Sequence, residues 1–270
     1  MPDRYAVMGN PIAHSKSPRI HALFARETGE SLVYDSILVP IDGFAAAVAE
    51  FEASGGRGLN VTVPFKQQAW YGVDRRTARA ERAGAVNTIA MTPAGRLGDN
   101  TDGAGLVRDL LHNHGIELHG RRILILGAGG AVRGVLPSLL AEAPAEIVIA
   151  NRTRERAEAI AAALADLGQV KACAPQRLAG DKHFDLVING TSAGLHGEIP
   201  ALPEDLRVDG ATAYDMIYGE VPTAFCRWAL GRGAARALDG LGMLVEQAAE
   251  SFLLWRGIRP QTDAVIRMLR

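Results

Sequence analysis

The stretch RRILILGAGGAVRGVLPSLLAE, residues 121–142, decides the fold. It opens with a continuous apolar run from Ile123 to Leu126, which is typical of a parallel strand buried on both faces of a sheet. Glycines follow this run at once, and the residues after them have the spacing of a helix. The stretch therefore predicts a buried strand, a tight glycine turn and a helix, in that order.

The same scheme recurs in EIVIANRTRERAEAIAAALADLG, residues 146–168. The run from Ile147 to Ala150 predicts a second strand, and Thr153 is a suitable N-cap for the helix that follows. Gly168 is expected to end that helix. The apolar face of the helix is predicted to hold Ala157, Ile160, Ala161 and Leu164.

Three later stretches have the pattern of strands that end in polar or glycine-containing loops. They are FDLVINGTSAG (184–194), ATAYDMIYG (211–219) and ARALDGLGM (235–243). Strands that alternate with helices predict an α/β chain with a mostly parallel sheet. We therefore expect residues 103–237 to form a doubly wound, Rossmann-type domain.

The first hundred residues also predict an α/β lobe. Strands are expected at YAVMG (5–9), LVYDSILV (32–39), GLNVTV (58–63) and AVNTIAM (85–91). A helix is expected at residues 17–29, with Ser17 as N-cap and Pro18 at its first position. Near the chain's end, GMLVEQAAESFLLWRG (242–257) predicts an amphipathic helix. The apolar face of that helix would hold Leu241, Val245, Ala248, Phe252 and Trp255.

Composition narrows the class of protein. The 270 residues are 48% hydrophobic and 22% charged, as in a globular protein with a full core. The net charge of −1 gives no strong attraction to nucleic acid or to a membrane. Two distant cysteines, Cys173 and Cys226, favour a reducing, cytoplasmic setting. The sequence shows no signal-peptide pattern and no apolar run long enough to span a membrane. Monomer and homodimer both remain open.

The glycine loop GAGGAVR, residues 127–133, lies between the predicted strand and helix, which is the context of a dinucleotide-binding loop. Gly127 permits the tight turn, and Gly129 lets the backbone approach a pyrophosphate at the helix start. Val132 departs from the usual third glycine. The alternative is an ordinary glycine-rich turn that binds no ligand.

The end of the second strand indicates which dinucleotide binds. NAD-binding folds place an acidic residue about 20 positions after the loop, where it bonds the ribose 2′-hydroxyl. This chain has Asn151, Arg152 and Thr153 there, and Arg156 one turn later. Guanidinium groups bind a 2′-phosphate, so the pattern predicts NADP(H). The alternative is a solvated helix face paired with Glu155 and Glu158, and it is expected for Arg154.

Two ionisable residues in the first lobe could carry proton transfer, which a hydride transfer at an alcohol carbon requires. Lys66 follows the strand GLNVTV, and Asp102 stands in GDNTDGAGL. The chain has no Ser-x-x-x-Tyr-x-x-x-Lys spacing and no zinc-ligand spacing, and no metal is expected. The alternatives are a solvated loop lysine for Lys66 and a helix N-cap for Asp102.

Polar residues close to these two could hold a hydroxylated substrate. Alternation along the strand places Asn60 and Thr62 on one face and Val61 and Val63 on the other. Further candidates are Ser15 and Ser17, whose hydroxyls suit a carboxylate beside a helix start, and Asn87. Gln247 lies at the edge of the last helix's apolar face, and its default interpretation is a surface amide. For Ser17 taken alone, the alternative is a plain helix N-cap.

In order and spacing, the motifs together resemble the shikimate dehydrogenase family, from about residue 5 to the last helix. The motifs are GNPIAHSKSP, GLNVTVPFK, GAVNT, GDNTDGAG, GAGGA, NRT, NGTSAG, YDMIY and GLGMLVEQAA. The resemblance implies reversible, NADPH-dependent reduction of 3-dehydroshikimate to shikimate, in the route to chorismate and the aromatic amino acids. It also implies a substrate domain at residues 1–102 completed by 238–270, an NADP-binding domain at 103–237, and a C-terminal helix that packs back on the first lobe.

The resemblance also implies roles for individual residues. Lys66 and Asp102 match the catalytic pair. The substrate positions are matched by Ser15, Ser17, Asn60, Thr62, Lys66, Asn87, Asp102, Tyr218 and Gln247. The NADP positions are matched by Gly127, Ala128, Gly129, Gly130, Ala131, Asn151, Arg152, Thr153, Arg156, Met216 and Gly240.

Two alternatives remain open at this stage. One is a sister enzyme of the same fold that uses quinate or an aminated analogue, possibly with NAD. Related enzymes of that kind tend to carry an acidic residue where this chain has Asn151 and Arg152. The other is a catalytically silent NADP-binding regulator, which the intact pair Lys66 and Asp102 disfavours.

Overall fold

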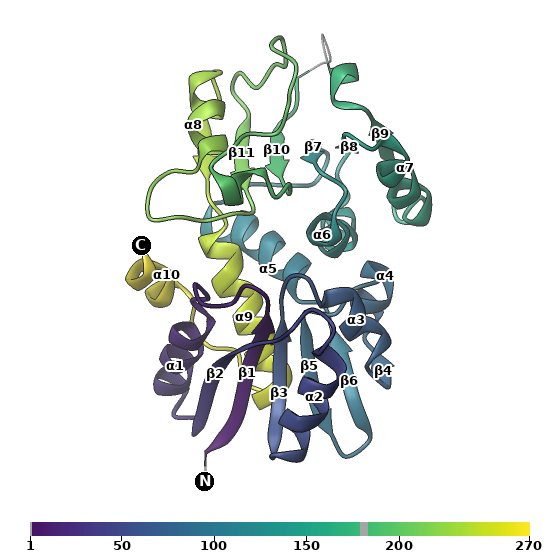
Figure 1. Ribbon diagram of the computed structural model, residues 1–270. Helices are drawn as coiled ribbons and strands as arrows, with labels where there is room; N and C mark the ends of the chain where they lie inside the picture. The colour runs from purple at the N-terminus through teal and green to yellow at the C-terminus, as the bar shows by residue number, and fades with distance from the viewer. Residues whose placement is uncertain (1, 179–182) are drawn as a thin grey trace. The chain divides into compact units, whose positions relative to one another are not determined.

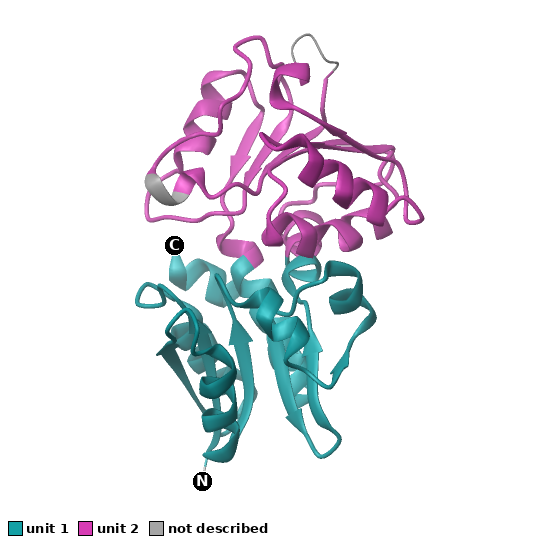
Figure 2. Ribbon diagram, turned by 45° about the vertical axis from the view of Figure 1, so that its right-hand side comes forward, with its two compact units in different colours: residues 1–105, 244–270 teal, residues 106–243 magenta. Residues whose placement is uncertain are grey.

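The computed structural model describes residues 2–178 and 183–270. The chain forms two compact units, which Figure 2 shows in different colours. Unit 1 comprises Met1–Gly105 and Leu244–Arg270, and unit 2 comprises Leu106–Met243. Within the described residues, no helix has the length and apolar character needed to cross a lipid bilayer.

Unit 2 is built on a six-stranded sheet that contains β7 (Arg122–Leu126), β8 (Glu146–Ala150), β9 (Val170–Cys173), β10 (Leu186–Asn189), β11 (Thr212–Asp215) and β12 (Arg236–Leu238). The strand order is β12-β11-β10-β7-β8-β9, and the pairings are parallel (Figure 1). Counted along the chain, this order is 3-2-1-4-5-6, the doubly wound arrangement of dinucleotide-binding domains. The predicted Rossmann-type fold is confirmed.

Both faces of this sheet are covered. In β7, Ile123 and Ile125 pack in one apolar cluster with Leu136, whereas Leu124 packs in a second cluster with Phe225. The continuous apolar run that predicted β7 therefore reflects burial on both faces. The helical segments of unit 2 are α6 (Gly130–Ala141), α7 (Arg154–Ala163), α8 (Ala224–Gly231), a π-helix (Asp109–Asn113) and two 3-10 turns (Pro175–Leu178 and Ala193–His196).

Unit 1 is built on a second six-stranded sheet that contains β1 (Asp3–Gly9), β2 (Leu32–Leu38), β3 (Gly56–Val61), β4 (Arg75–Arg76), β5 (Thr88–Thr92) and β6 (Gly95–Asp99). The order is β2-β1-β3-β5-β6-β4. Strand β5 runs antiparallel to β3 and β6, and the other pairings are parallel. The helices are α1 (Ser17–Thr28), α2 (Phe44–Ala53), α3 (Lys66–Tyr71), α4 (Ala78–Ala83) and α10 (Asp263–Leu269). Unit 1 also contains the first residues of α5 (Asp102–Arg108) and most of α9 (Leu241–Arg256).

Helix α9 packs on the sheet of unit 1, as predicted. Trp255 donates from Nε1 to the carbonyl oxygen of Ile89 at 3.0 Å. Arg256 pairs with Asp3 at 2.5 Å and also with Glu30. Four of the five residues predicted for the apolar face of α9 are buried, namely Leu241, Val245, Ala248 and Phe252, whereas the fifth, Trp255, is only partly buried.

The strand that precedes Lys66 is shorter than predicted. It ends at Val61, and the carbonyl of Thr62 accepts from the backbone N–H of Phe65 at 3.0 Å, so the chain turns there. Pro64 has no N–H to extend the strand, and Val63 is 61% exposed. The predicted alternation of faces therefore stops at Val61, and the placement of Thr62 on the strand was wrong.

Two predicted helix ends need correction, at Ser17 and Gly168, whereas the predicted N-cap position of Thr153 is confirmed. Ser17 is the first residue of α1 rather than its N-cap, which is Lys16. Thr153 occupies the N-cap position of α7, but its hydroxyl makes no capping bond. Helix α7 ends at Ala163, five residues before Gly168, in a turn closed by the bond from Leu164 N–H to Ala161.

Candidate active site

Lys66 and Asp102 form a close ion pair in unit 1. Lys66 opens α3 directly after the turn that follows β3, and Asp102 opens α5 after the end of β6. Nζ of Lys66 donates to Oδ2 of Asp102 at 2.5 Å, and the two side chains are 21% and 8% exposed. The interpretation of Lys66 as an unpaired loop charge was therefore wrong.

The carboxylate of Asp102 is fully engaged by side chains. Its second oxygen, Oδ1, accepts from Nδ2 of Asn87 at 2.8 Å. The side chain of Asn100 caps the first N–H of α5, because its Oδ1 accepts from the backbone N–H of Asp102 at 3.2 Å. The N-cap position itself is held by Thr101, whose carbonyl accepts from the N–H of Gly105. The alternative prediction of Asp102 as an N-cap was wrong, since both of its oxygens bond Lys66 and Asn87 instead.

The amide of Asn87 joins this pair to helix α9. Nδ2 of Asn87 also lies 2.9 Å from Oγ1 of Thr101 and 3.3 Å from Oε1 of Gln247. Gln247 is only partly exposed, and its Nε2 donates to the carbonyl of Leu244 at 2.8 Å. The default interpretation of Gln247 as a surface amide was therefore wrong, because α9 turns this residue toward the Asn87 cluster.

A second layer of polar side chains lies beneath these residues. Nδ2 of Asn60 lies 3.0 Å from Oγ1 of Thr88 and 2.9 Å from Oγ of Ser251. Thr88, Thr101 and Ser251 are fully buried, and their hydroxyls lie within 2.8 to 3.4 Å of one another. A buried polar network of this kind rigidifies its members when they are satisfied.

These three buried hydroxyls were not predicted from the sequence. Thr88 directly follows the predicted Asn87 in GAVNT, and Thr101 directly precedes the predicted Asp102 in DNTD. Ser251 lies four residues after Gln247, so the two share one face of α9. That helical spacing is the signal that could have identified Ser251.

The predicted serines lie at the start of α1. The backbone N–H of Ser17 donates to Oγ of Ser15 at 3.3 Å. Ser17 is 7% exposed. The hydroxyl of Tyr34 donates to Oδ1 of Asn60 at 2.8 Å, in the second layer. Thr62 has no hydrogen bond to the Lys66–Asp102 pair.

A buried ion pair braces the segment that carries Asp102. Arg79 donates to both carboxylate oxygens of Asp99, at 2.7 and 2.5 Å. Burial acts to raise the pKa of Asp99, but the bonds and charge of Arg79 outweigh it, so this pKa lies below its ordinary value. Oδ1 of Asp99 also accepts from the backbone N–H of Asn100 at 2.8 Å, directly before the Thr101–Asp102 corner.

The glycine loop of unit 2 has the predicted form. Gly127 has φ +103°, in the region that favours glycine, and its N–H donates to the carbonyl of Ala150 at 2.8 Å. The space beside Gly129 and Gly130 is open, because a Cβ placed on either would meet no atom within 4 Å. Val132 is buried where the usual third glycine would stand, and its Cγ2 lies 2.4 Å from where a Cβ on Gly190 would be. Glycine at position 190 thus accommodates valine at 132. Ala128 is partly exposed and Ala131 is exposed.

The end of β8 presents basic side chains to solvent. Arg152, Thr153 and Arg156 are exposed, and Nδ2 of Asn151 donates to the carbonyl of Thr153 at 2.7 Å. Arg154 pairs with Glu158 at 2.6 Å, which confirms it as the solvated helix-face residue. Among the described residues, Arg152 and Arg156 pair with no carboxylate, so both guanidinium groups remain available to a phosphate.

Met216 and Gly240 lie together after β11 and β12. A Cβ on Gly240 would lie 2.4 Å from the carbonyl oxygen of Met216, and the Gly240 N–H donates to Ile217 at 3.0 Å. Tyr218 belongs to the same loop. It is partly buried, and burial raises the pKa of its hydroxyl.

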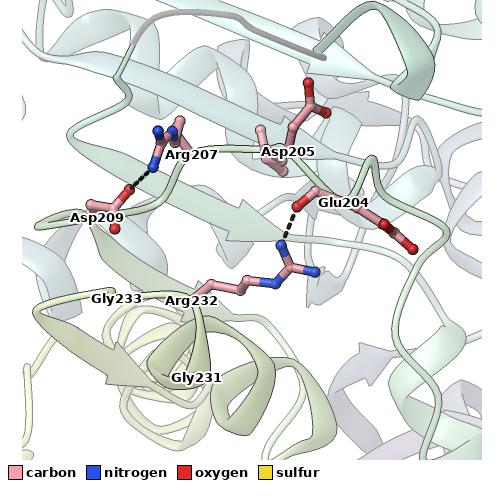
Figure 3. A pocket seen from close by; sticks show the side chains of 8 residues that line it. Glu204, Asp205, Arg207, Asp209, Gly231, Arg232 and Gly233 are labelled. Carbon is pink, nitrogen blue, oxygen red and sulfur yellow. Dashed lines mark hydrogen bonds and ion pairs between the residues drawn. The ribbon is translucent and has the colours of Figure 1, made fainter.

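A surface depression lies elsewhere on unit 2. It has a volume of about 420 Å³ and is lined by residues 204–207, 209 and 231–233 (Figure 3). Arg207 pairs with Asp209 at 3.5 Å, and Arg232 donates to the carbonyl oxygen of Glu204. None of the predicted site residues lines it, so we place no chemistry there.

Three family models match the chain. Residues 7–89 match the shikimate dehydrogenase substrate binding domain, and residues 109–196 match shikimate/quinate 5-dehydrogenase. Residues 240–270 match the shikimate 5′-dehydrogenase C-terminal domain.

The chain is also similar to curated proteins and solved structures over its full length. It is 65% identical to the shikimate dehydrogenase (NADP(+)) of Alkalilimnicola ehrlichii, over 100% of this chain and 99% of that protein. An Ael1 enzyme from Pseudomonas putida has a TM-score of 0.93 at 46% identity, over 99% and 98% of the two chains. Shikimate 5-dehydrogenase from Thermus thermophilus, solved with NADP(H) and shikimate, has a TM-score of 0.87 at 32% identity, over 98% and 97%. The chain therefore belongs to the shikimate dehydrogenase family.

Proposed function

We propose that this protein is an NADP-dependent shikimate dehydrogenase. It would reduce 3-dehydroshikimate to shikimate reversibly, in the route to chorismate and the aromatic amino acids. The observation that carries the proposal is the Lys66–Asp102 ion pair, held between Asn87 and the Asn100 cap. The curated relatives named as shikimate dehydrogenase (NADP(+)) support it over the full chain.

The proposed roles fall mostly on separate units. Unit 1 carries the proton-transfer pair and most of the proposed substrate residues, whereas unit 2 carries the proposed NADP(H) residues and Tyr218. NADPH, when bound, supplies the hydride. The open space beside Gly129 and Gly130 fits close approach of a pyrophosphate to the start of α6. Arg152 and Arg156 would hold the 2′-phosphate. The remaining residues proposed to bind NADP(H) are Gly127, Ala128, Ala131, Asn151, Thr153, Met216 and Gly240.

Lys66 is the proton donor for the reduction. Its ammonium gives a proton to the substrate oxygen as negative charge develops there, and takes it back in the reverse direction. Asp102 holds Nζ in one position and keeps the pair's charge balanced. Asn87 fixes the Asp102 carboxylate, so the proton donor and its partner are positioned before substrate arrives.

The remaining polar residues select the substrate. Ser15 and Ser17, at the start of α1, suit the substrate carboxylate, because the helix N-terminus favours negative charge. Amide and hydroxyl groups would bond the ring hydroxyls. They are contributed by Asn60, Thr62, Asn87, Tyr218 and Gln247.

A cytoplasmic location completes the proposal. Cys173 and Cys226 are free thiols, which suits a reducing compartment. The state of assembly is a monomer or a homodimer, which light scattering on the purified protein separates.

Initial rates on the purified protein test the proposal. Shikimate and quinate are each offered with NADP⁺ and with NAD⁺, and the reduced nicotinamide is followed by its absorbance. The proposal predicts the highest kcat/KM with shikimate and NADP⁺. Preference for quinate or for NAD⁺ would identify the sister enzyme, and absence of turnover with all four pairs would favour a silent NADP-binding protein.

A further inference from the structure

Asp215 is a fully buried carboxylate at the carboxyl end of β11. Burial raises the pKa of its side chain, and the nearby charge of Asp239 contributes in the same direction. Within residues 2–178 and 183–270, no lysine, arginine or histidine pairs with it. A buried carboxylate without a cation is costly, so its hydrogen bonds must account for its position.

Three donors from three different segments converge on this carboxylate. Oδ1 accepts from Nδ2 of Asn189 at 3.0 Å and from the backbone N–H of Ile217 at 3.2 Å. Oδ2 accepts from Oγ1 of Thr223 at 2.6 Å. Asn189 ends the neighbouring strand β10, and its own Oδ1 accepts from the N–H and the hydroxyl of Thr191. Asp215 therefore joins the loop after β10 to the loop after β11.

The loops that Asp215 joins are also packed against each other. The Met216 sulfur lies 3.2 Å from where a Cβ on Gly190 would be, and Ile217 packs equally closely on Gly194. The N–H of Met216 donates to the carbonyl of Asn189 at 2.9 Å. The residues from 189 to 194 and from 215 to 218 thus form one connected cluster, which we call the β10–β11 loop cluster.

The position of this cluster in the sheet indicates the part of the cofactor that it serves. A doubly wound sheet has two mononucleotide-binding halves, which meet between its first and fourth strands. The glycine loop after β7 and the basic end of β8 belong to the half that would hold the adenosine phosphates. The β10–β11 loop cluster belongs to the other half, which would hold the nicotinamide nucleotide.

We propose that Asp215 is a positioning residue for the nicotinamide half of NADP(H). Its carboxylate fixes the β10–β11 loop cluster, so the loop Met216–Tyr218 is held in a binding-competent form before the cofactor arrives. This inference rests on the proposed cofactor, and it adds a role for a residue that touches neither substrate nor cofactor.

Two ligands separate this role from general stabilisation of unit 2. NADP⁺ spans both halves of the site, whereas 2′,5′-ADP carries only the adenosine and its phosphates. In Asp215→Ala, titration calorimetry should show NADP⁺ binding weakened by about tenfold to a hundredfold, as expected for losing bonds to a charged group. Binding of 2′,5′-ADP should change by less than about twofold. This ligand lacks the nicotinamide nucleotide that the β10–β11 loop cluster would hold.

Conservative variants keep the test decisive. Asp215→Asn retains an acceptor for Asn189 and Ile217, so it should restore most of the NADP⁺ affinity. If Asp215→Ala does not fold, Thr223→Ala removes one bond to the same carboxylate and should give the same selective loss, which Thr223→Ser should not. Tyr214→Phe is the matched control, because it removes a buried bond to Asp109, at 2.6 Å, made by the neighbouring residue of β11. It should leave the ratio of the two affinities unchanged.

Two outcomes would overturn the role of Asp215: equal weakening of both ligands, and unchanged NADP⁺ binding in Asp215→Ala and Thr223→Ala. Failure of the unmodified protein to bind NADP⁺ would instead overturn the proposed cofactor, and this inference with it.

Discussion

Asn100 caps the helix that Asp102 begins, and this leaves the whole Asp102 carboxylate to side-chain partners. The Asn100 Oδ1 accepts from the Asp102 N–H at 3.2 Å, while Lys66 and Asn87 bond the two carboxylate oxygens at 2.5 and 2.8 Å. An aspartate at a helix start ordinarily competes for the capping role. The relationship between Asn100 and Asp102 removes that competition at the position where proton transfer is proposed.

The first prediction concerns this cap. Asn100→Ala should lower the free energy of unfolding by about 1 kcal/mol, the usual net loss for one hydrogen bond. It should also lower kcat several-fold, because the Asp102 carboxylate can then turn toward the free N–H groups of α5. Asn100→Ser keeps a capping oxygen and should retain more of both. Denaturant unfolding and initial rates measure the two effects, and an unchanged kcat in Asn100→Ala would contradict this account of the cap.

The second prediction concerns the buried layer under the substrate residues. Ser251→Ala removes one fully buried hydrogen-bond partner from Asn60 and from Thr88, so it should cost about 1–3 kcal/mol of stability. The KM for shikimate should rise, because Asn60 loses one of the bonds that fix its orientation. Ser36→Ala, at an exposed serine of unit 1, is the matched control and should change neither quantity. Equal, negligible effects of both substitutions would show that the layer does not position Asn60.

The third prediction concerns cofactor choice. Replacing Arg152 and Arg156 together by glutamine should raise the KM for NADP⁺ by about tenfold to a hundredfold, because charge-assisted bonds to the 2′-phosphate are lost. The KM for NAD⁺ should change little. Arg154→Gln is the control, since Arg154 already pairs with Glu158. Equal losses with the two cofactors would refute the phosphate contact.

The fourth prediction concerns pH and stability. His21 is fully buried and stacks on Tyr34 at 4.1 Å between ring centroids. Burial lowers its pKa from 6.5 to about 3, despite an opposing contribution from Asn60. The unfolded chain therefore binds a proton below pH 6.5 that the folded chain does not bind until about pH 3. The contribution of neutral His21 to the free energy of unfolding is fully present above pH 6.5 and is lost as the pH falls toward 3.

Within that window the loss should approach about 1.4 kcal/mol per pH unit. Denaturant unfolding at several pH values, compared with His21→Gln, isolates the contribution of this residue. The difference in unfolding free energy between the two proteins should decrease steadily toward acid. Parallel pH curves would show that His21 does not titrate differently in the folded and unfolded states.

Sequence periodicity and turn chemistry predicted the Rossmann-type fold of unit 2, although they did not identify strand β9 or helix α8. The run from Ile123 to Leu126 and the glycines after it indicate one structure only, since local pattern and fold agree there. Unit 1 was harder, because antiparallel β5 and the early end of β3 at Val61 depend on a turn that the run to Val63 conceals. A continuous β-branched run looks the same whether its last residues pair or turn.

In the candidate active site, too, residues marked by local sequence patterns were predicted, whereas contacts between distant parts of the sequence were not. Lys66 and Asp102 were identifiable as ionisable residues beside predicted strand and helix ends. Ser251 was not, because it meets Asn60 across 191 residues of sequence, and only the packing of α9 on the sheet brings them together. The cap by Asn100 was missed for another reason, since Asp102 itself has the better-known capping position.

The most direct test of the central claim is the turnover of Lys66→Ala with shikimate and NADP⁺, measured together with shikimate binding. Loss of the proton-transfer group should lower kcat by about a hundredfold to ten-thousandfold, while the Kd of shikimate changes much less. Lys171→Ala, at an exposed lysine of unit 2, should turn over like the unmodified protein. A Lys66→Ala protein that keeps near-normal kcat would contradict the assignment of proton transfer to the Lys66–Asp102 pair.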